Sequence, residues 1–280
     1  MGWSVWGCCQ LGVVLSLVTR RVIGRLGRVF PNDLSGRQGG AGLAPENTRG
    51  AFKQAAELGV DGCELDVRLS KDGEVVVIHD ATLERTTDAD GPVSALTAAE
   101  LERVDAGFRF GAGAGFPWRG RSEGVPRLAD VLADHPALAF IVEVKGDDPA
   151  VARAAAAVVA RAGALDRVCF GGFSDATLAA VRAAEPAACT SAATEEIRWA
   201  LYKSYVWWPP GRVAYQAFQV PEVANGGTRV VSPRFVRVVR RGGRVLHVWT
   251  VNTPADIARL KAWGVDGVIT DRPDVALQFR

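Results

Sequence analysis

Two acidic residues and a histidine lie around one predicted β-hairpin. Glu64 and Asp66 are two residues apart in an apolar run, so their side chains share one face of an extended strand. Asp72 and Gly73 form a two-residue hairpin signal, and counting back from this turn places His79 directly opposite Asp66. Carboxylates and an imidazole on one face could bind a hard metal ion and transfer protons. The simpler alternative is a half-buried hairpin whose polar face is only solvated.

A second acidic residue pattern ends another apolar run. Glu143 and Lys145 share a face at the end of the predicted strand at 138–145. Glu64, Asp66 and Glu143 would together form an all-oxygen site suited to Ca²⁺ or Mg²⁺. Lys145 and the metal could then neutralise a phosphoryl oxygen while His79 moves a proton. A plain ion pair between Glu143 and Lys145 is the alternative, which three motifs at successive strand ends disfavour.

The elements that must position these residues alternate between strand and helix. From residue 128 to residue 270, apolar runs alternate with helical patterns, which predicts a parallel sheet. With the Glu64 strand, counted once together with its hairpin arm, the chain has seven predicted strands. An eighth before Gly39 would close a TIM (β/α)8 barrel, for which 280 residues is a suitable length. The residues before Gly39, Pro31-Asn-Asp-Leu-Ser-Gly-Arg-Gln38, have little propensity for a central strand.

The expected domain organisation is an N-terminal segment followed by one barrel. Residues 81–124 follow the hairpin, mix Thr, Gly, Asp and aromatic residues, and contain one short helical pattern near residues 97–104. This stretch is too long for a plain loop, so it is expected to form a small insertion over the site. The barrel is therefore expected to span residues 37–280, after an apolar leader and basic linker at residues 1–36.

The N-terminal segment leaves two alternatives open. Residues 3–18 carry no charge, are mostly apolar and are followed by Arg20 and Arg21. The run is short for a membrane-spanning helix and lacks the basic start of a signal peptide. It fits a membrane anchor or a poorly ordered, non-native leader equally well. If it inserts, the arginines would keep the main domain in the cytoplasm, so the expected location is the cytoplasm or the cytoplasmic membrane surface.

Composition excludes several other classes of function. The chain has 33 Lys and Arg against 31 Asp and Glu, a net charge of +2, which gives no support to nucleic-acid binding. Five cysteines without a CxxC pair predict neither a disulfide framework nor a zinc site. Cys63, Cys169 and Cys189 lie in apolar runs and are expected to be buried thiols. His135 and His247 are expected to be structural.

The chain resembles the glycerophosphodiester phosphodiesterase family over about residues 39–273. The motifs that carry the resemblance are Pro45-Glu-Asn-Thr48, Glu64-x-Asp66, Lys71-Asp-Gly73, His79-Asp80, Leu83-x-Arg-Thr-Thr87, Glu143-x-Lys145, Trp249-Thr-Val-Asn252 and Gly267-Val-Ile-Thr-Asp-Arg-Pro273. The resemblance implies a TIM barrel with a small insertion and hydrolysis of glycerophosphodiesters to glycerol 3-phosphate and an alcohol. It also implies a metal site, an acid/base histidine and a lysine at Glu64, Asp66, Glu143, His79 and Lys145.

One position departs from the family pattern. The family's first barrel strand ends in His-Arg-Gly, where this chain has Arg37-Gln38-Gly39. Arginine has a pKa above ~12 and cannot act as a base at neutral pH, but it can bind a phosphate. Arg37 and Gln38 are therefore assigned to substrate binding. Trp249 is a third candidate for substrate binding, since it either lines the mouth of the barrel or packs within it.

Two functions follow from these observations. The first is a metal-dependent phosphodiesterase that converts glycerophosphodiesters to glycerol 3-phosphate, or lysophospholipids to a lysophosphatidate, with release of an alcohol. The second is a catalytically impaired barrel that binds phosphodiesters without turnover, because of Arg37. A phospholipase C-like barrel that forms a cyclic phosphate is a weaker third hypothesis. The segment Tyr205-Val-Trp-Trp-Pro-Pro-Gly211 fits a lid, a membrane-facing wedge or a packed loop, and stays unassigned.

Overall fold

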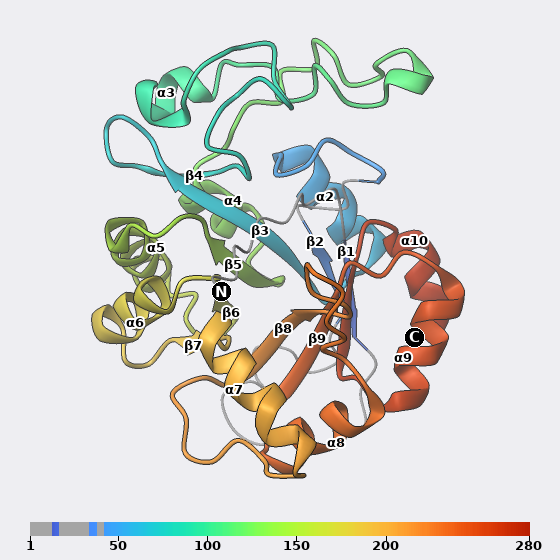
Figure 1. Ribbon diagram of the computed structural model, residues 1–280. Coiled ribbons are helices and arrows are strands. Elements are labelled where there is room, and N and C mark those ends of the chain that lie inside the picture. Colours follow the sequence, from blue (N-terminus) through green and yellow to red (C-terminus); the bar gives the residue numbers. More distant parts are fainter. Residues whose placement is uncertain (1–12, 17–33, 38–41) are drawn as a thin grey trace.

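Strands and helices alternate around a closed barrel in the computed structural model, which describes residues 13–16, 34–37 and 42–280 (Figure 1). The strands are β1 (Val13–Ser16), β2 (Leu34–Arg37), β3 (Gly62–Leu69), β4 (Val75–Val77), β5 (Ala139–Val144), β6 (Val168–Gly171), β7 (Cys189–Thr190), β8 (Ala217–Pro221), β9 (Val245–Trp249) and β10 (Gly267–Thr270). The helices are α2 (Arg49–Leu58), α3 (Ala98–Leu101), α4 (Leu128–Asp134), α5 (Pro149–Arg161), α6 (Asp175–Ala184), α7 (Thr194–Tyr205), α8 (Pro233–Arg241), α9 (Pro254–Trp263) and α10 (Pro273–Ala276). Short 3-10 turns lie at η1 (Val93–Ala95), η2 (Ala112–Ala114) and η3 (Leu277–Phe279).

Parallel pairing closes the barrel. Strands β2, β3, β5, β6 and β7 pair in parallel on one side, and β8, β9 and β10 do so on the other. The ring closes through Gly36 beside Thr270 and through a parallel bridge between Ser191 and Ala217. The predicted α/β barrel is confirmed. Its eighth strand is β2, so the demand for a closing strand overrides the low strand propensity of Leu-Ser-Gly-Arg.

Strand β1 lies beside the closing strands and runs against them. Its backbone pairs antiparallel with β10 and with β2. The rest of residues 3–18 lies outside the described residues, so membrane association through this run stays a prediction, as do the domain boundaries at residues 36 and 37. Within the described part of the chain, no helix is long and apolar enough to cross a membrane.

The helices cover the barrel with one apolar face each. In α5, for example, Val151, Ala155 and Val159 repeat at helical spacing and are buried. Asp148 caps this helix by accepting from Ala150 N, and Pro149 occupies its first turn. Small residues such as Ala139 and Cys189 fill the barrel interior. The buried thiols Cys63, Cys169 and Cys189 agree with the sequence prediction.

The β3–β4 hairpin differs from its predicted register by one residue. Val67 pairs with Val77, and Ser70 N donates to Glu74 O at 3.0 Å, so residues 71–73 form a three-residue loop. Gly73 adopts a left-handed φ of 78°, as this kind of loop requires. The prediction that His79 lies directly opposite Asp66 is therefore wrong. Ile78 donates to Asp66 O at 2.9 Å, and His79 follows the end of β4.

Residues between β4 and α4 form a small layer beyond the hairpin, at the top of Figure 1. This layer has its own apolar cluster, in which Leu83, Val93 and Leu101 pack with Val76 and Ile78 around the hairpin. Helix α3 inside it begins with a capping box at Thr97. The layer holds the chain that follows His79 against the barrel.

Candidate active site

Three carboxylates meet where β3 and β5 run side by side. Asp66 pairs in register with Glu143, so both side chains lie on the face that points into the barrel. Glu64, one pleat earlier on β3, shares this face, and both Glu64 and Asp66 are buried. A ligand oxygen from each of the three carboxylates lies within 4.8 Å of the others. The structure therefore brings together the three residues predicted to bind a metal.

Lys145 completes this cluster from the end of β5. Its Nζ lies 2.8 Å from Asp66 Oδ1 and 2.5 Å from Glu143 Oε1. Burial alone would lower the pKa of Lys145, but the charges of the neighbouring carboxylates outweigh this and raise it. Lys145 is therefore a cation in this structure, in direct contact with two carboxylates of the cluster.

Asn47 orients the carboxylate of Asp66 from the opposite side. Its Nδ2 donates to Asp66 Oδ2 at 3.0 Å, and its Oδ1 accepts from Asp66 N at 3.3 Å. Asn47 is buried and holds a left-handed φ of 59°, which asparagine tolerates better than most residues. Asn47 was not predicted as a site residue, although it lies in the Pro45-Glu-Asn-Thr48 motif.

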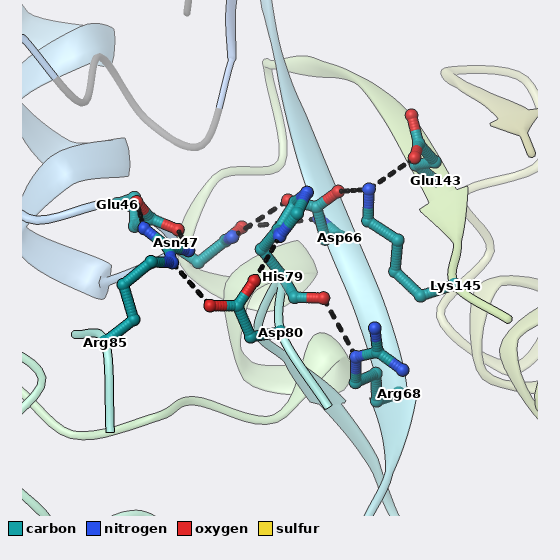
Figure 2. Close-up of polar contacts among 9 residues, drawn as sticks. All are labelled: Glu46, Asn47, Asp66, Arg68, His79, Asp80, Arg85, Glu143 and Lys145. Atoms are coloured by element: carbon teal, nitrogen blue, oxygen red, sulfur yellow. Dashed lines mark hydrogen bonds and ion pairs between the residues drawn. The ribbon is translucent and has the colours of Figure 1, made fainter. Parts of the chain in front are cut away.

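His79 is held through a chain of charged residues (Figure 2). Its Nδ1 lies 2.6 Å from Asp80 Oδ1, and the other oxygen of Asp80 accepts from Arg85 Nε. Arg85 also donates to both carboxylate oxygens of Glu46, at 2.8 and 2.6 Å. The backbone oxygen of His79 accepts from Arg68 Nε at 2.9 Å. His79 is thus fixed at both its ring and its backbone.

The charges of this chain of residues support one another. Burial would raise the pKa of Asp80, but hydrogen bonds from His79 and Arg85 outweigh it and lower that pKa well below its ordinary value. Hydrogen bonds to Glu46 raise the pKa of Arg85. Asp80 is therefore an anion beside the imidazole, which favours a proton on Nδ1. Asp80, Arg85 and Glu46 were not predicted as site residues, although three of the family motifs contain them.

The predicted substrate-binding residues lie in three different situations. Trp249 lines a cavity together with Glu64, Glu143 and Phe173. The rings of Trp249 and Phe173 pack edge-on, with their centroids 6.0 Å apart. The backbone of Arg37 pairs with Glu64, which places residue 37 beside the carboxylate cluster, and its side chain is not described. Gln38 lies outside the described residues.

The remaining histidines and the motif around Asn252 have structural surroundings. His135 follows α4 and contacts the Phe52 ring edge-on at 6.5 Å, and His247 is fully buried on β9. Asn252 accepts from Asp271 N at 2.7 Å and from Thr270 Oγ1 at 2.9 Å. These bonds join the loop after β9 to the end of β10, so this motif shapes the rim of the barrel.

The carboxylate cluster has the chemistry of a divalent cation site. Its three donors are all oxygens, which Ca²⁺ and Mg²⁺ prefer, and Lys145 alone cannot balance three negative charges. Glu64, Asp66 and Glu143 can each supply a ligand, and Glu64 and Glu143 also line the cavity. The residues present therefore fit a hard divalent cation.

Comparisons with known proteins agree with this geometry. Residues 38–275 match the glycerophosphoryl diester phosphodiesterase family. A glycerophosphodiester phosphodiesterase from Caldanaerobacter subterraneus subsp. tengcongensis is 31% identical over 243 residues, covering 84% of this chain and 92% of that protein. Another from Bacillus subtilis is 29% identical, covering 85% and 83% of the two chains.

Two solved structures are similar in fold. A glycerophosphodiester phosphodiesterase from Agrobacterium tumefaciens has a TM-score of 0.68 at 26% identity and covers 86% of this chain and 96% of its own. The glycerophosphoryl diester phosphodiesterase domain of a Mycobacterium tuberculosis protein has a TM-score of 0.76 at 24% identity, with 87% and 97% covered. The resemblance seen in the sequence motifs is confirmed.

Proposed function

Since this chain belongs to the glycerophosphoryl diester phosphodiesterase family and is a phosphoric diester hydrolase, we propose that its hydrolysis of glycerophosphodiesters depends on a divalent metal. The products are glycerol 3-phosphate and an alcohol. The observation that carries the proposal is the convergence of Glu64, Asp66 and Glu143 within 4.8 Å of one another at one end of the barrel. Ca²⁺ and Mg²⁺ both suit this donor set.

The residues of the site divide the reaction between them. Glu64, Asp66 and Glu143 would hold the cation, which would polarise the phosphoryl oxygens when bound. Lys145 would bind a phosphoryl oxygen, since its ammonium already lies at the edge of this cluster. His79 would donate a proton to the departing alcohol from Nε2, because Nδ1 is engaged by Asp80. Trp249 and Phe173 would pack against the glycerol or alcohol portion.

The test is release of glycerol 3-phosphate from glycerophosphocholine and glycerophosphoethanolamine with Ca²⁺, Mg²⁺ or a chelator. We expect turnover with one of the two cations, little turnover with the chelator, and loss of turnover in His79→Ala. Full turnover in the chelator would contradict the metal dependence. Parallel assays with lysophospholipids separate a lysophosphatidate product from glycerol 3-phosphate, and a cyclic phosphate product would favour phospholipase C-like chemistry.

A second candidate function rests on residue 37. Arginine stands here where the family has its first histidine, and the backbone register places it beside Glu64. Arg37, together with Gln38, would bind the phosphodiester without exchanging protons. The barrel would then bind substrate with impaired turnover. Detectable diester binding in the absence of turnover would favour this function over the first.

A further inference from the structure

Helix α7 carries apolar side chains on its outer face as well as its inner face. Ala200, Leu201 and Ser204 face the barrel and are buried. On the outside, Trp199 and Tyr202 are 62% and 52% exposed and meet edge-on at 6.2 Å. A helix that faces water on one side normally carries polar residues there. The outer face of α7 therefore has the composition of a contact surface.

This surface continues into the loop after α7. Val206 and Trp208 are 70% and 66% exposed, and Trp207 is also exposed. Backbone bonds hold the loop in place, since Val206 N and Trp208 N both donate to Lys203 O, at 3.1 and 3.0 Å. Pro210 packs closely against Gly242, the residue after α8, because a Cβ built on Gly242 would lie 2.8 Å from the Pro210 side chain. An anchored loop with exposed aromatic rings fits a wedge better than a lid or a packed loop.

Arginines of α8 surround these rings. Arg237 lies over the Trp207 ring at 5.0 Å, and Arg241 lies over the same ring at 5.7 Å. Arg234 lies over the Tyr205 ring at 4.3 Å. Residues 194–241 contain eight Lys or Arg and three Asp or Glu, a net charge of +5 in a chain whose total is +2. The stretch that contains these rings is thus net positive, and three of its arginines lie directly over two of the rings.

We propose that this face docks on an anionic phospholipid surface. The aromatic–arginine face consists of Trp199, Tyr202, Tyr205, Val206, Trp207, Trp208, Arg234, Arg237 and Arg241. Tryptophan and tyrosine favour the boundary between lipid headgroups and acyl chains, and arginine extends from there to lipid phosphates. A second copy of the chain is the poorer occupant, because a symmetric contact would bring two strongly positive faces together. A bilayer rich in anionic lipid supplies the opposite charge.

The position of this face suits a soluble substrate. Helix α7 leads into β8 from the end of the barrel opposite the carboxylates, because those side chains lie at the C-terminal ends of the parallel strands. The tryptophan loop therefore lies at the far end from the cavity. In Figure 1, α7 and α8 lie together on the outside of the barrel. Docking through this face leaves the cavity open to water, so bound and free enzyme should turn over soluble diesters equally.

The test is flotation of the full chain with vesicles of phosphatidylcholine alone or with about one third phosphatidylglycerol. We expect binding to the anionic vesicles, weakened as salt rises from about 0.1 M to about 0.5 M. The double variant Trp207→Ser, Trp208→Ser should lose at least about tenfold in partitioning, and Arg237→Gln, Arg241→Gln about 10- to 30-fold. The matched control Arg153→Gln, Arg161→Gln removes two exposed charges from α5 and should bind normally.

Further results decide the proposal. Brominated lipids should quench tryptophan fluorescence in the parent chain and less in the tryptophan variant, whose thermal unfolding should be unchanged. Binding that is the same in all variants would assign membrane association to residues 3–18 and overturn the proposal. Equal binding to neutral and anionic vesicles, or no binding to any vesicle, would overturn it as well. So would a parent chain that is dimeric in light scattering while the tryptophan variant is monomeric.

Discussion

His79 depends on its sequence neighbour for its orientation. Asp80 contacts Nδ1 at 2.6 Å and is an anion, so it aligns the ring and stabilises a protonated imidazole. We expect His79→Ala to lower kcat by about 10²–10⁴ with a small change in KM, because a positioned acid is lost. Asp80→Asn should lower kcat by less, since it leaves the imidazole in place. Steady-state release of glycerol 3-phosphate measures both variants, and a parental kcat in His79→Ala would remove this histidine from the mechanism.

A substitution at Arg37 should raise kcat, whereas those at His79 and Asp80 should lower it. Its backbone lies beside Glu64, where the family has a histidine. Replacement by histidine should raise kcat by on the order of 10²–10⁴, because an imidazole can exchange protons at neutral pH and a guanidinium cannot. Arg37→Gln is the matched control, since it removes the positive charge without adding a base. Equal kcat in the parent chain and in Arg37→His would show that residue 37 does not limit turnover.

The carboxylates on regular strands could be predicted from the sequence, whereas Asn47 and Arg85, on irregular segments, could not. Glu64, Asp66 and Glu143 follow the two-residue period of strands, and parallel pairing of β3 with β5 brings them together. Asn47 and Arg85 reach the same site from irregular segments 19 residues before Asp66 and five residues after Asp80. No periodicity fixes where such side chains point. Their role in the site becomes visible only in three dimensions.

The backbone conformation of the β3–β4 loop should contribute to the stability of the fold. Gly73 has a φ of 78° and no atoms lie within 4 Å of a Cβ built on it. Gly73→Ala should therefore destabilise the fold by about 1 kcal/mol through backbone strain alone, and Gly73→Asn by clearly less. Urea unfolding of the two variants and the parent measures the difference. Equal losses in both variants would contradict the conformational cause.

The same loop shows why the predicted register failed. Asp-Gly indicates a two-residue turn, but a three-residue loop with glycine in the left-handed region uses the same residue pair. The side chain of Ser70 selects the longer loop, since it accepts from Glu74 N at 3.0 Å and bonds to Asp72 at 2.6 Å. Strand β2 was difficult for another reason. Its pairing with β3 and β10 comes from barrel closure and not from its own residues.

The bonds between Glu46, Arg85 and Asp80 join the segment before α2 to the loop after β4. Asp80 has a lowered pKa in the folded state, so its ionised form stabilises the fold above about pH 4 and this contribution disappears as pH falls through the lowered pKa. Because Arg85 is 41% exposed, we expect Asp80→Asn to cost only about 1 kcal/mol near pH 7. Urea unfolding measured at intervals from about pH 7 down to about pH 2 should show this difference shrinking as pH falls below about 4. The exposed control Asp90→Asn should change the free energy of unfolding little at any pH. A loss of stability in Asp80→Asn that does not depend on pH would contradict the ion pair.

Across the whole molecule, the barrel separates two kinds of surface. Carboxylates, Lys145 and His79 lie at the C-terminal ends of the strands, where a TIM barrel has its cavity. The aromatic–arginine face lies along α7 and α8 and continues to the other end. A substitution in the tryptophan loop or in α8 should therefore leave the carboxylate cluster unaffected, because distant sites contribute independently.

Cation binding should be visible in the stability of the whole chain. Glu64, Asp66 and Glu143 crowd three negative charges within 4.8 Å, so a divalent cation that relieves their repulsion binds the folded state and hardly binds the separated residues of the unfolded chain. At a free concentration 100-fold above its Kd, a cation adds about 2.7 kcal/mol, which corresponds to a rise in Tm on the order of 5–10 °C. Thermal unfolding with Ca²⁺, Mg²⁺ or a chelator measures the shift. Glu143→Gln should abolish the rise in Tm, and the exposed control Asp147→Asn should preserve it. If the Tm of the parent chain responds to neither cation, the carboxylate cluster does not bind a metal, whatever the activity of the enzyme.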